Sequence, residues 1–430
     1  MVGVERLDQW LAHLEGIHPQ PIDLELSRIT EVANRLGLRG VDASIITVAG
    51  TNGKGSTVAC LEAMLQAGGY QPGAYTSPHL LRFNERIRVS GEAVSDALIV
   101  QAFTAIEAAR ERITLTYFEF ATLAAAWCFR EQGANPWLLE VGLGGRLDAT
   151  NCFDADLAIV TPIDLDHMEW LGDNREAIAG EKLGIARPGR PLVCSDPNPP
   201  ARIADRAAEL GAAYWQLGRD YQLTAQTHGG WCWSSSSARY EDLPQPTWLA
   251  DAAMGNAAGA VMALSGAYPG VQVDEAAIYQ GLAQATLMGR QQWVSFDHQR
   301  WLLDVGHNPA AIGLLVERLS QLRARDGGVV RLAFALMQRK PLPALIDQLI
   351  GVVDEWFVLT LDDPDAHPPA AVQSALDAAG GVVLGCGDAS AARAVMNADS
   401  MANDLNVAVG SFRVVEAFLR LAPSRLQDAV

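Results

Sequence analysis

The segment that most constrains the fold covers residues 45–65, where an apolar run, a glycine-rich turn and a second apolar run follow one another. Residues 45–49 are mostly apolar or β-branched and predict a buried strand. Glycines surround a single lysine, Lys54, and the apolar spacing of residues 58–65 predicts a helix. This order is typical of a phosphate-binding loop, because glycines let backbone N–H groups turn inward and the start of a helix carries partial positive charge.

The glycine loop departs in two places from the common phosphate-loop pattern. Val48 stands where that pattern has a glycine, and Gly55 separates Lys54 from the hydroxyl groups of Ser56 and Thr57. A glycine-rich turn with a surface lysine is therefore the alternative. Binding of ATP or GTP is the favoured interpretation because strand, loop and helix agree, with the lysine on phosphate and a hydroxyl group on Mg²⁺.

Length and composition predict a two-domain protein. The chain has 430 residues, and its hydrophobic content of 49% is enough for two full cores. No apolar run approaches the roughly 20 residues that span a bilayer, and the first residues lack the basic start and apolar core of a secretory signal. The six cysteines form no C-x-x-C pair. We therefore expect a cytoplasmic protein with reduced thiols.

The net charge of −18 argues against a nucleic-acid partner and against an anionic membrane surface. A substrate that carries phosphates and carboxylates is anionic as well. Metal ions or individually placed lysines and arginines must therefore bind it, because the protein as a whole repels it.

Predicted strands alternate with predicted helices, which indicates an α/β fold with a mostly parallel, doubly wound sheet. Ligands bind at the carboxyl ends of the strands in such sheets. Polar clusters follow predicted strands at the glycine loop, at Ser77, at residues 140–151 and at residues 164–167. Residues 115–120 precede a predicted alanine-rich helix. The pattern loosens over residues 202–248, where we expect surface elaboration with a small antiparallel sheet.

A second alanine-rich helix is predicted over residues 254–264, starting near Asn256. The alternation of strands and helices restarts after Met288. We therefore expect a first domain over residues 1–290 and a smaller α/β domain over residues 291–430.

The chain resembles the folylpolyglutamate synthases over nearly its whole length, and more narrowly the bacterial bifunctional dihydrofolate synthase/folylpolyglutamate synthases. The glycine loop and four further motifs carry the resemblance: TSPHL at 76–80, EVGLGGRLDATN at 140–151, LDH at 165–167 and EKLGI at 181–185. A wider resemblance extends to the Mur ligases. It implies a P-loop ATPase-like first domain and a smaller Rossmann-like glutamate ligase domain.

The resemblance implies ATP-dependent amide formation through an acyl phosphate. L-Glutamate is added to 7,8-dihydropteroate, giving dihydrofolate, and to the glutamate tails of tetrahydrofolate. Phosphorylation gives the poorly electrophilic carboxylate a good leaving group, and lysines, arginines and metal ions offset the repulsion among the anionic substrates. The expected partners are these small molecules, and a monomer is expected.

Site residues follow from the motifs that match the family, and each set has a shared role. The resemblance implies that ATP is bound by Thr51, Asn52, Gly53, Lys54, Gly55, Ser56, Asn256, Arg290 and Asp304. It implies two Mg²⁺ sites, the first at Ser77 and Glu140 and the second at His167. It implies a dihydropteroate pocket formed by Ile22, Asp23, Leu24, Thr116, Tyr117, Phe118, Glu119, Leu147, Asp148 and Ala149. Lys54, His167 and Lys182 are the expected catalytic residues, and Lys182 is expected to carry a carbamate.

Each of these residues also has an ordinary structural interpretation. Ser77, before Pro78, and Asp148 could simply shape turns, and Asn256 could be a helix N-cap. Glu140, Arg290 and Lys182 could be surface charges. His167 and Phe118 could be ordinary buried side chains.

Two departures from the family stand in the second half of the chain: Met288, where proline is common, and residues 336–341, where an Asp-Lys-Asp type of segment is common. Three other functions stay open, namely a Mur-type ligase with a different acceptor, a phosphotransferase that uses the same ATP site, and a nucleotide-binding regulatory module.

Overall fold

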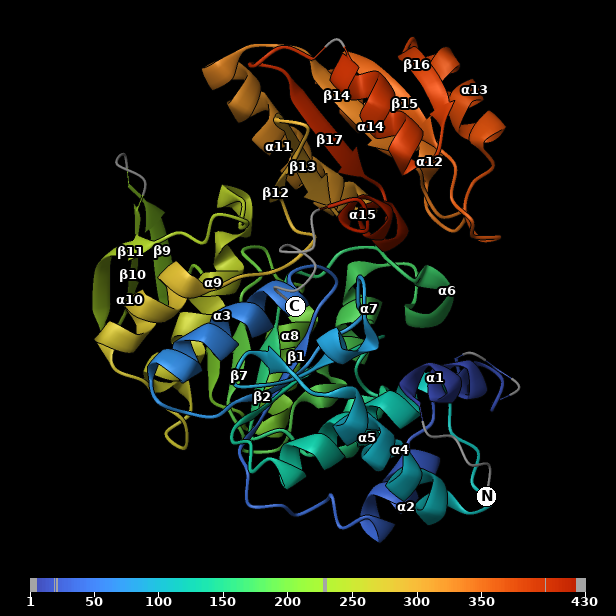
Figure 1. The fold of residues 1–430 in the computed structure, drawn as a ribbon. Helices are drawn as coiled ribbons and strands as arrows, with labels where there is room; N and C mark the ends of the chain where they lie inside the picture. The colour runs from blue at the N-terminus through green and yellow to red at the C-terminus, as the bar shows by residue number, and fades with distance from the viewer. Residues whose placement is uncertain (1–5, 19, 21, 227–229, 399, 423–430) are drawn as a thin grey trace. The chain divides into compact units, whose positions relative to one another are not determined.

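The computed structural model describes residues 6–18, 20, 22–226, 230–398 and 400–422. The chain divides into two compact units (Figure 1). The first comprises Met1–Pro246 and Met254–Thr286, and the second comprises Thr247–Ala253 and Leu287–Val430. The main part of the second unit thus begins close to the expected residue 291. The unit also includes the short segment Thr247–Ala253, which precedes α9 (Met254–Met262) in the chain.

The first unit is built on an eight-stranded sheet in the order β4-β3-β2-β5-β1-β6-β7-β8. Pairing is parallel from β2 through β8, and β3 and β4 add antiparallel strands at one edge. This confirms the predicted, mostly parallel sheet. The strands are β1 (Ile45–Ala49), β2 (Gly73–Tyr75), β3 (Ile87–Val89), β4 (Glu92–Ala93), β5 (Trp137–Glu140), β6 (Leu157–Val160), β7 (Leu192–Cys194) and β8 (Tyr214–Gln216).

Helices cover both faces of this sheet. An apolar core joins α1, α2, α4 and α5 to it, and a second core joins α7 and α8 to β6 and β7. The glycine-loop helix α3 is largely buried and packs against α9 and α10. The helices are α1 (Leu7–Glu15), α2 (Ser27–Arg35), α3 (Lys54–Ala67), α4 (Asp96–Arg110), α5 (Tyr117–Glu131), α6 (Met168–Leu171), α7 (Arg175–Lys182), α8 (Ala201–Leu210), α9 (Met254–Met262) and α10 (Glu275–Gln284), with the short turns η1 (Phe83–Arg86), η2 (Ala149–Cys152), η3 (Leu183–Ile185) and η5 (Ala263–Ala267).

Helix α5 begins earlier than the sequence predicted. Residues 117–120 form its first turn, whereas we expected them before the helix. The reason is a capping box: the Thr116 hydroxyl accepts from the Glu119 N–H, and the Glu119 carboxylate accepts from the Thr116 N–H. In α9 the helix already begins at Met254, so Asn256 lies inside it and is no N-cap.

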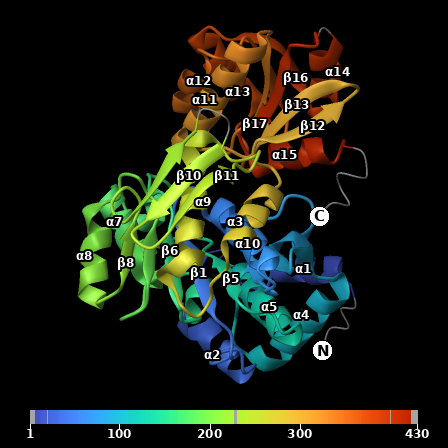
Figure 2. The same ribbon diagram turned by 90° about the vertical axis from the view of Figure 1, so that its left-hand side faces the viewer.

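The regular pattern continues past residue 202, where we predicted that it loosens. Helix α8 packs on the main sheet, and β8 is its last strand. The predicted small antiparallel sheet is confirmed over β9 (Tyr221–Ala225), β10 (Gly230–Ser235) and β11 (Arg239–Pro244). Figure 2 shows these strands as a separate ribbon beside α9. The Trp233 ring stacks on Tyr240 at a centroid distance of 5.4 Å, which anchors the hairpin.

The second unit contains a six-stranded sheet in the order β12-β13-β17-β14-β15-β16, antiparallel only between β12 and β13. Its central strands β14 and β17 are buried along their whole length. The elements are β12 (Gln292–Phe296), β13 (Gln299–Asp304), β14 (Val330–Phe334), β15 (Glu355–Leu359), β16 (Val382–Gly387), β17 (Leu405–Val409), η4 (Asp251–Ala253), α11 (Pro309–Asp326), α12 (Leu342–Leu349), α13 (Pro369–Ala379), α14 (Ala389–Ala398) and α15 (Phe412–Leu419). Throughout the described ranges, no helix is both long and apolar enough to cross a membrane.

A buried ion-pair cluster closes one end of this second sheet. The Arg331 side chain is 7% exposed and contacts the carboxylates of Asp404 at 2.8 Å and Glu355 at 2.7 Å. Asp404, 5% exposed, also accepts from the backbone N–H groups of Val329 and Met401. The cluster therefore joins β14 and β15 to the turn before β17.

We expect Asp404→Ala to lower the free energy of unfolding by about 1–3 kcal/mol, because the buried Arg331 guanidinium loses one of its two carboxylate partners and keeps only Glu355. Denaturant or thermal unfolding of the second unit measures this. The matched control is Asp326→Ala, which removes the partner of the exposed Arg325 and should change stability little. An equally small effect of both substitutions would contradict the prediction.

Candidate active site

The glycine loop lies at the carboxyl end of β1 and opens helix α3. Gly53 has a φ of 89°, and a Cβ atom there would approach the side chain of Asn256 to 2.4 Å. The loop is tied down because Thr51 N–H donates to the Pro162 carbonyl and the Thr51 hydroxyl donates to the Asp164 carbonyl. The loop conformation is therefore fixed by its neighbours.

Asn256 supports the expectation of a bound nucleotide. Its side chain is buried against Gly53, and among the described residues its Oδ1 atom has no hydrogen-bond partner. A buried polar atom without a partner costs free energy that a ligand can recover. Asn256 thus fits a group that binds at the glycine loop.

Two lysines converge on one carbonyl oxygen at this loop. The Nζ atoms of Lys54 and Lys182 donate to the Gly50 carbonyl at 3.1 Å and 2.8 Å. Lys182 is only 4% exposed, so its interpretation as a helix-surface charge is wrong. Burial, with the nearby charge of Lys54, lowers the pKa of the Lys182 amine to about 7. Lys54 thus supplies a positive charge at the loop that suits phosphate, while Lys182 is partly neutral near pH 7.

Glu140 and Ser77 lie together at the adjacent strand ends. Glu140 is 5% exposed, which excludes the exposed-charge interpretation, and its Oε2 accepts from the Ser77 N–H at 3.1 Å. Both Glu140 oxygens lie 3.7 Å from where a Cβ atom on Gly55 would stand, over the first turn of α3. A carboxylate beside a hydroxyl residue is a suitable donor set for Mg²⁺.

His167 follows β6 and directly precedes α6. It has a φ of 51° and an exposed side chain, so it is not a satisfied buried histidine. Its N–H donates to the Asp166 carboxylate. In the part of the chain that the structure describes, no three His, Cys, Asp or Glu side chains form a metal-binding group. A second metal at His167 therefore stays a prediction.

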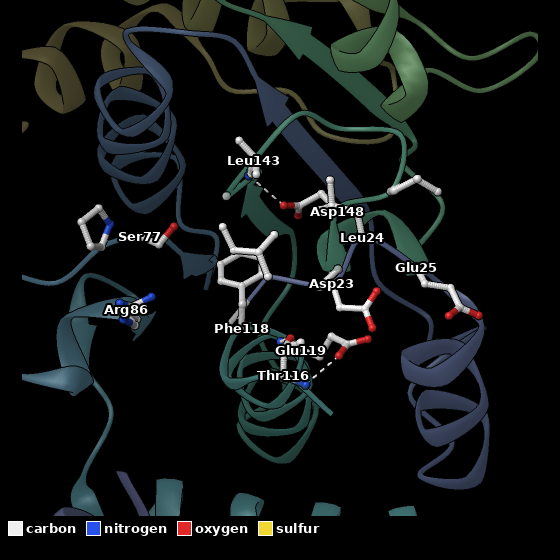
Figure 3. A pocket seen from close by; sticks show the side chains of 15 residues that line it. Asp23, Leu24, Glu25, Ser77, Arg86, Thr116, Phe118, Glu119, Leu143 and Asp148 are labelled. Carbon is white, nitrogen blue, oxygen red and sulfur yellow. Dashed lines mark hydrogen bonds between the residues drawn. The ribbon is translucent and has the colours of Figure 1, made fainter. Parts of the chain in front are cut away.

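A cavity of about 260 Å³ lies beside these groups (Figure 3). Nine of the ten residues predicted for the dihydropteroate pocket line it. Tyr117 does not line it, because it points to another side of α5 and packs on Phe83. The lining comprises Ile22, Asp23, Leu24, Glu25, Ser77, Pro78, Arg86, Thr116, Phe118, Glu119, Gly142, Leu143, Leu147, Asp148 and Ala149.

The cavity combines a flat apolar surface with carboxylates. The Phe118 ring stands in its centre in Figure 3, and a Cβ atom on Gly142 would meet this ring at 2.5 Å. Phe118 is therefore a wall of the cavity, whereas its neighbour Phe120 is fully buried in the core. An aromatic wall can stack on a flat heterocycle, while carboxylates accept from its N–H groups.

Arg28 was missed in the sequence and organises the carboxylates. Its guanidinium contacts Asp23 at 2.8 Å, Glu25 at 3.0 Å and Glu119 at 3.4 Å, and all three line the cavity. Burial raises the pKa of Glu119, against the opposing effects of its hydrogen bonds to Thr116 and the charge of Arg28. The only hint of this role in the sequence was the position of Arg28 on a predicted helix shortly after Asp23.

Asp148 combines the two roles considered for it. Its carboxylate accepts from the N–H groups of Leu143 and Thr150 and from the Thr150 hydroxyl, so it caps a turn. It also lines the cavity (Figure 3). Burial raises the pKa of this carboxyl, while the hydrogen bonds from Thr150 and Leu143 lower it.

Arg290 and Asp304 belong to the second unit, at the start of β12 and the end of β13. The Asp304 carboxylate accepts from the N–H groups of Gln291 and Gly306. Burial raises the pKa of Asp304, and the Arg290 charge lowers it. The Arg290 charge thus lies near enough to the buried Asp304 carboxyl to act on it.

Comparison with known proteins agrees with this geometry. Residues 289–412 match the family model for the Mur ligase, glutamate ligase domain. The chain is 40% identical to the dihydrofolate synthase/folylpolyglutamate synthase of Escherichia coli K12, over 97% of this chain and 96% of that one. It is similar to the solved structure of E. coli FolC in complex with DHPP and ADP, with a TM-score of 0.89, 38% identity and 97% coverage of both chains. It is also similar to a bifunctional folylpolyglutamate synthase/dihydrofolate synthase with Mn, AMPPNP and L-glutamate bound, with a TM-score of 0.87, 39% identity and coverage of 97% and 98%.

A glycine loop with two converging lysines, followed in the chain by a Mur ligase glutamate ligase domain, defines an ATP-dependent ligase of the Mur type. Within that class, identity over almost the whole length is decisive. The chain belongs to the dihydrofolate synthase/folylpolyglutamate synthase family.

We expect Asp148→Ala to raise the KM for the acceptor about tenfold or more, because a charge-assisted hydrogen bond is worth roughly 1.5–3 kcal/mol. The KM for ATP should change little. Steady-state kinetics with each substrate varied in turn measures both values.

The matched control is Thr150→Val, which removes one donor to Asp148 from a residue outside the cavity lining. It should lower thermal stability but leave the acceptor KM nearly unchanged. An equal rise in KM for both variants would mean that Asp148 acts only through the shape of its turn.

Proposed function

We propose that this protein uses ATP to join L-glutamate to 7,8-dihydropteroate and to the glutamate tail of tetrahydrofolates. The position of Ser77 is the main support for the proposal, because Ser77 belongs to both the acceptor cavity and the phosphate site. It lines the acceptor cavity, and its N–H is bonded to Glu140 beside the glycine loop. An acceptor carboxylate in the cavity can therefore approach a phosphate bound at the loop.

The titles of the related structures supply the ligand classes, and we extend them to this chain. Those proteins bind ADP with DHPP, or Mn with AMPPNP and L-glutamate. We infer that ATP, a divalent metal, a pterin acceptor and glutamate bind here. The glycine loop and Asn256 serve the nucleotide.

In this reaction the γ-phosphoryl group passes to the acceptor carboxylate, the glutamate amine attacks the acyl phosphate, and phosphate leaves. Lys54 stabilises negative charge on the phosphates. Such stabilisation by a fixed cation is expected to be a large part of the rate enhancement in phosphoryl transfer. Ser77 and Glu140 would hold Mg²⁺, and we assign His167 to a second ion. A metal ion there supplies charge neutralisation of the phosphates.

Lys182 is proposed to carry a carbamate, formed when its neutral amine attacks CO₂. An ordinary lysine with a pKa of 10.5 is neutral in fewer than about one molecule in a thousand at pH 7. A pKa of about 7 makes the neutral form common at that pH. The carbamate would also replace one of two adjacent positive charges at Gly50 by a negative one that can assist the metal site.

The protein is proposed to act as a cytoplasmic monomer whose first compact unit binds ATP and the pterin. All six cysteines are free thiols, and four of them are buried. This agrees with a reducing compartment.

The proposed function is tested by measuring ADP release with dihydropteroate and glutamate added together or singly. We expect release only when both are present, and Lys54→Ala should reduce kcat by about 10²–10³-fold while leaving the protein folded. Release without glutamate would select a phosphotransferase. Glutamate-dependent release with a UDP-muramyl acceptor in place of dihydropteroate would select a Mur-type ligase.

Lys182→Ala should lose activity and recover part of it with acetate, a small carboxylate that can occupy the place of the carbamate. Mass spectrometry of the intact parent protein, trapped under bicarbonate, provides a second measurement. Full activity of Lys182→Ala in CO₂-free buffer would exclude the carbamate. Arg202→Ala, at an exposed arginine of α8 that pairs with Glu209, is the matched control.

A further inference from the structure

Three arginines, Arg82, Arg86 and Arg88, lie close together in the sequence, and carboxylates neutralise two of them. Arg82 is exposed and pairs with Asp96 at 3.2 Å. Arg88 pairs with the buried Glu62 at 2.8 Å. Arg86, in the turn η1, is the exception.

Arg86 is 9% exposed and lines the cavity (Figure 3). Its Nε–H donates to Nδ1 of His79 at 2.8 Å, and its guanidinium lies over the rings of Phe83 and Tyr117 at 5.8 Å and 5.7 Å. Within the described ranges, no carboxylate forms an ion pair with Arg86 and no protein atom accepts from its two terminal nitrogens.

This environment fixes the guanidinium without neutralising it. Because Nδ1 of His79 accepts the hydrogen bond, the histidine contributes no opposite charge. A buried cation without a counter-charge is costly, and a guanidinium matches a carboxylate through two parallel N–H bonds. The arrangement therefore suits an anionic group that arrives with a ligand.

The remainder of the cavity shows where such an anion can bind. In Figure 3, Ser77 and Arg86 lie on one side of the Phe118 ring, and Asp23 and Glu25 lie on the other. The acidic side repels a carboxylate and accepts N–H groups. The acceptor must therefore place its heterocycle toward the acidic side and its carboxylate toward Ser77.

We propose that Arg86 binds a carboxylate of the acceptor and thereby orients it toward the phosphate site. This inference rests on the proposed function and adds the residue that recognises the anionic end of the acceptor. Two carboxylates share this chemistry: the one that reacts, present on every acceptor, and the additional one of a glutamate tail.

The test measures equilibrium binding and KM for Arg86→Gln and Arg86→Lys, with Arg82→Gln as the matched control. The ligands are dihydropteroate, tetrahydrofolate monoglutamate and 6-methyl-7,8-dihydropterin, which has no carboxylate. We expect Arg86→Gln to weaken binding of a carboxylate-bearing acceptor about tenfold or more. Arg86→Lys should recover part of the loss, and the carboxylate-free pterin should bind all variants equally.

Weaker binding of both dihydropteroate and tetrahydrofolate monoglutamate would assign Arg86 to the reacting carboxylate. Weaker binding of the tetrahydrofolate alone would assign Arg86 to the carboxylate of the glutamate tail. Unchanged binding of both acceptors, or an equal loss for the carboxylate-free pterin, would overturn the proposal. Binding is measured without turnover, so an inactive parent protein would refute the proposed function and leave this result interpretable. Thermal melting checks that each variant is folded.

Discussion

The approach of Lys54 and Lys182 to the Gly50 carbonyl is the contact on which the site depends. One carbonyl oxygen accepts from two amines that come from helices far apart in the sequence. Two ammonium groups repel each other strongly away from water. The loop can relieve this repulsion by binding an anion or by making one amine neutral. Phosphate binding and the proposed carbamate on Lys182 would thus both relieve the strain of this one contact.

The sheet topology explains why this contact can form. Parallel pairing of β1 with β5 and β6 brings three strand ends to one edge. The glycine loop, Glu140 and the segment before His167 follow these ends. Since the chain returns to the same edge after each crossover, residues separated by a hundred positions share a site.

The acceptor cavity has a division of charge that matches a molecule with a hydrogen-bond donor end and an anionic end. Arg28 keeps three carboxylates together on one wall, and Arg86 is held by His79 on another. Both arginines are fixed by the protein before any ligand arrives, which lowers the entropy cost of binding. Under the proposed function, the walls of the cavity would therefore set the orientation of the acceptor.

The sequence by itself determined the α/β fold, the glycine loop and most of the cavity residues, because strand, turn and helix signals are local and the motifs are specific. Only the tertiary structure decided that Lys182 is buried, that Tyr117 does not line the cavity, and that Arg86 forms no ion pair with a carboxylate of the described residues. The local sequence is similar around Arg82, Arg86 and Arg88, yet their partners come from different elements. Burial and charge pairing depend on which elements pack together, and such long-range contacts leave no periodic signal in the chain.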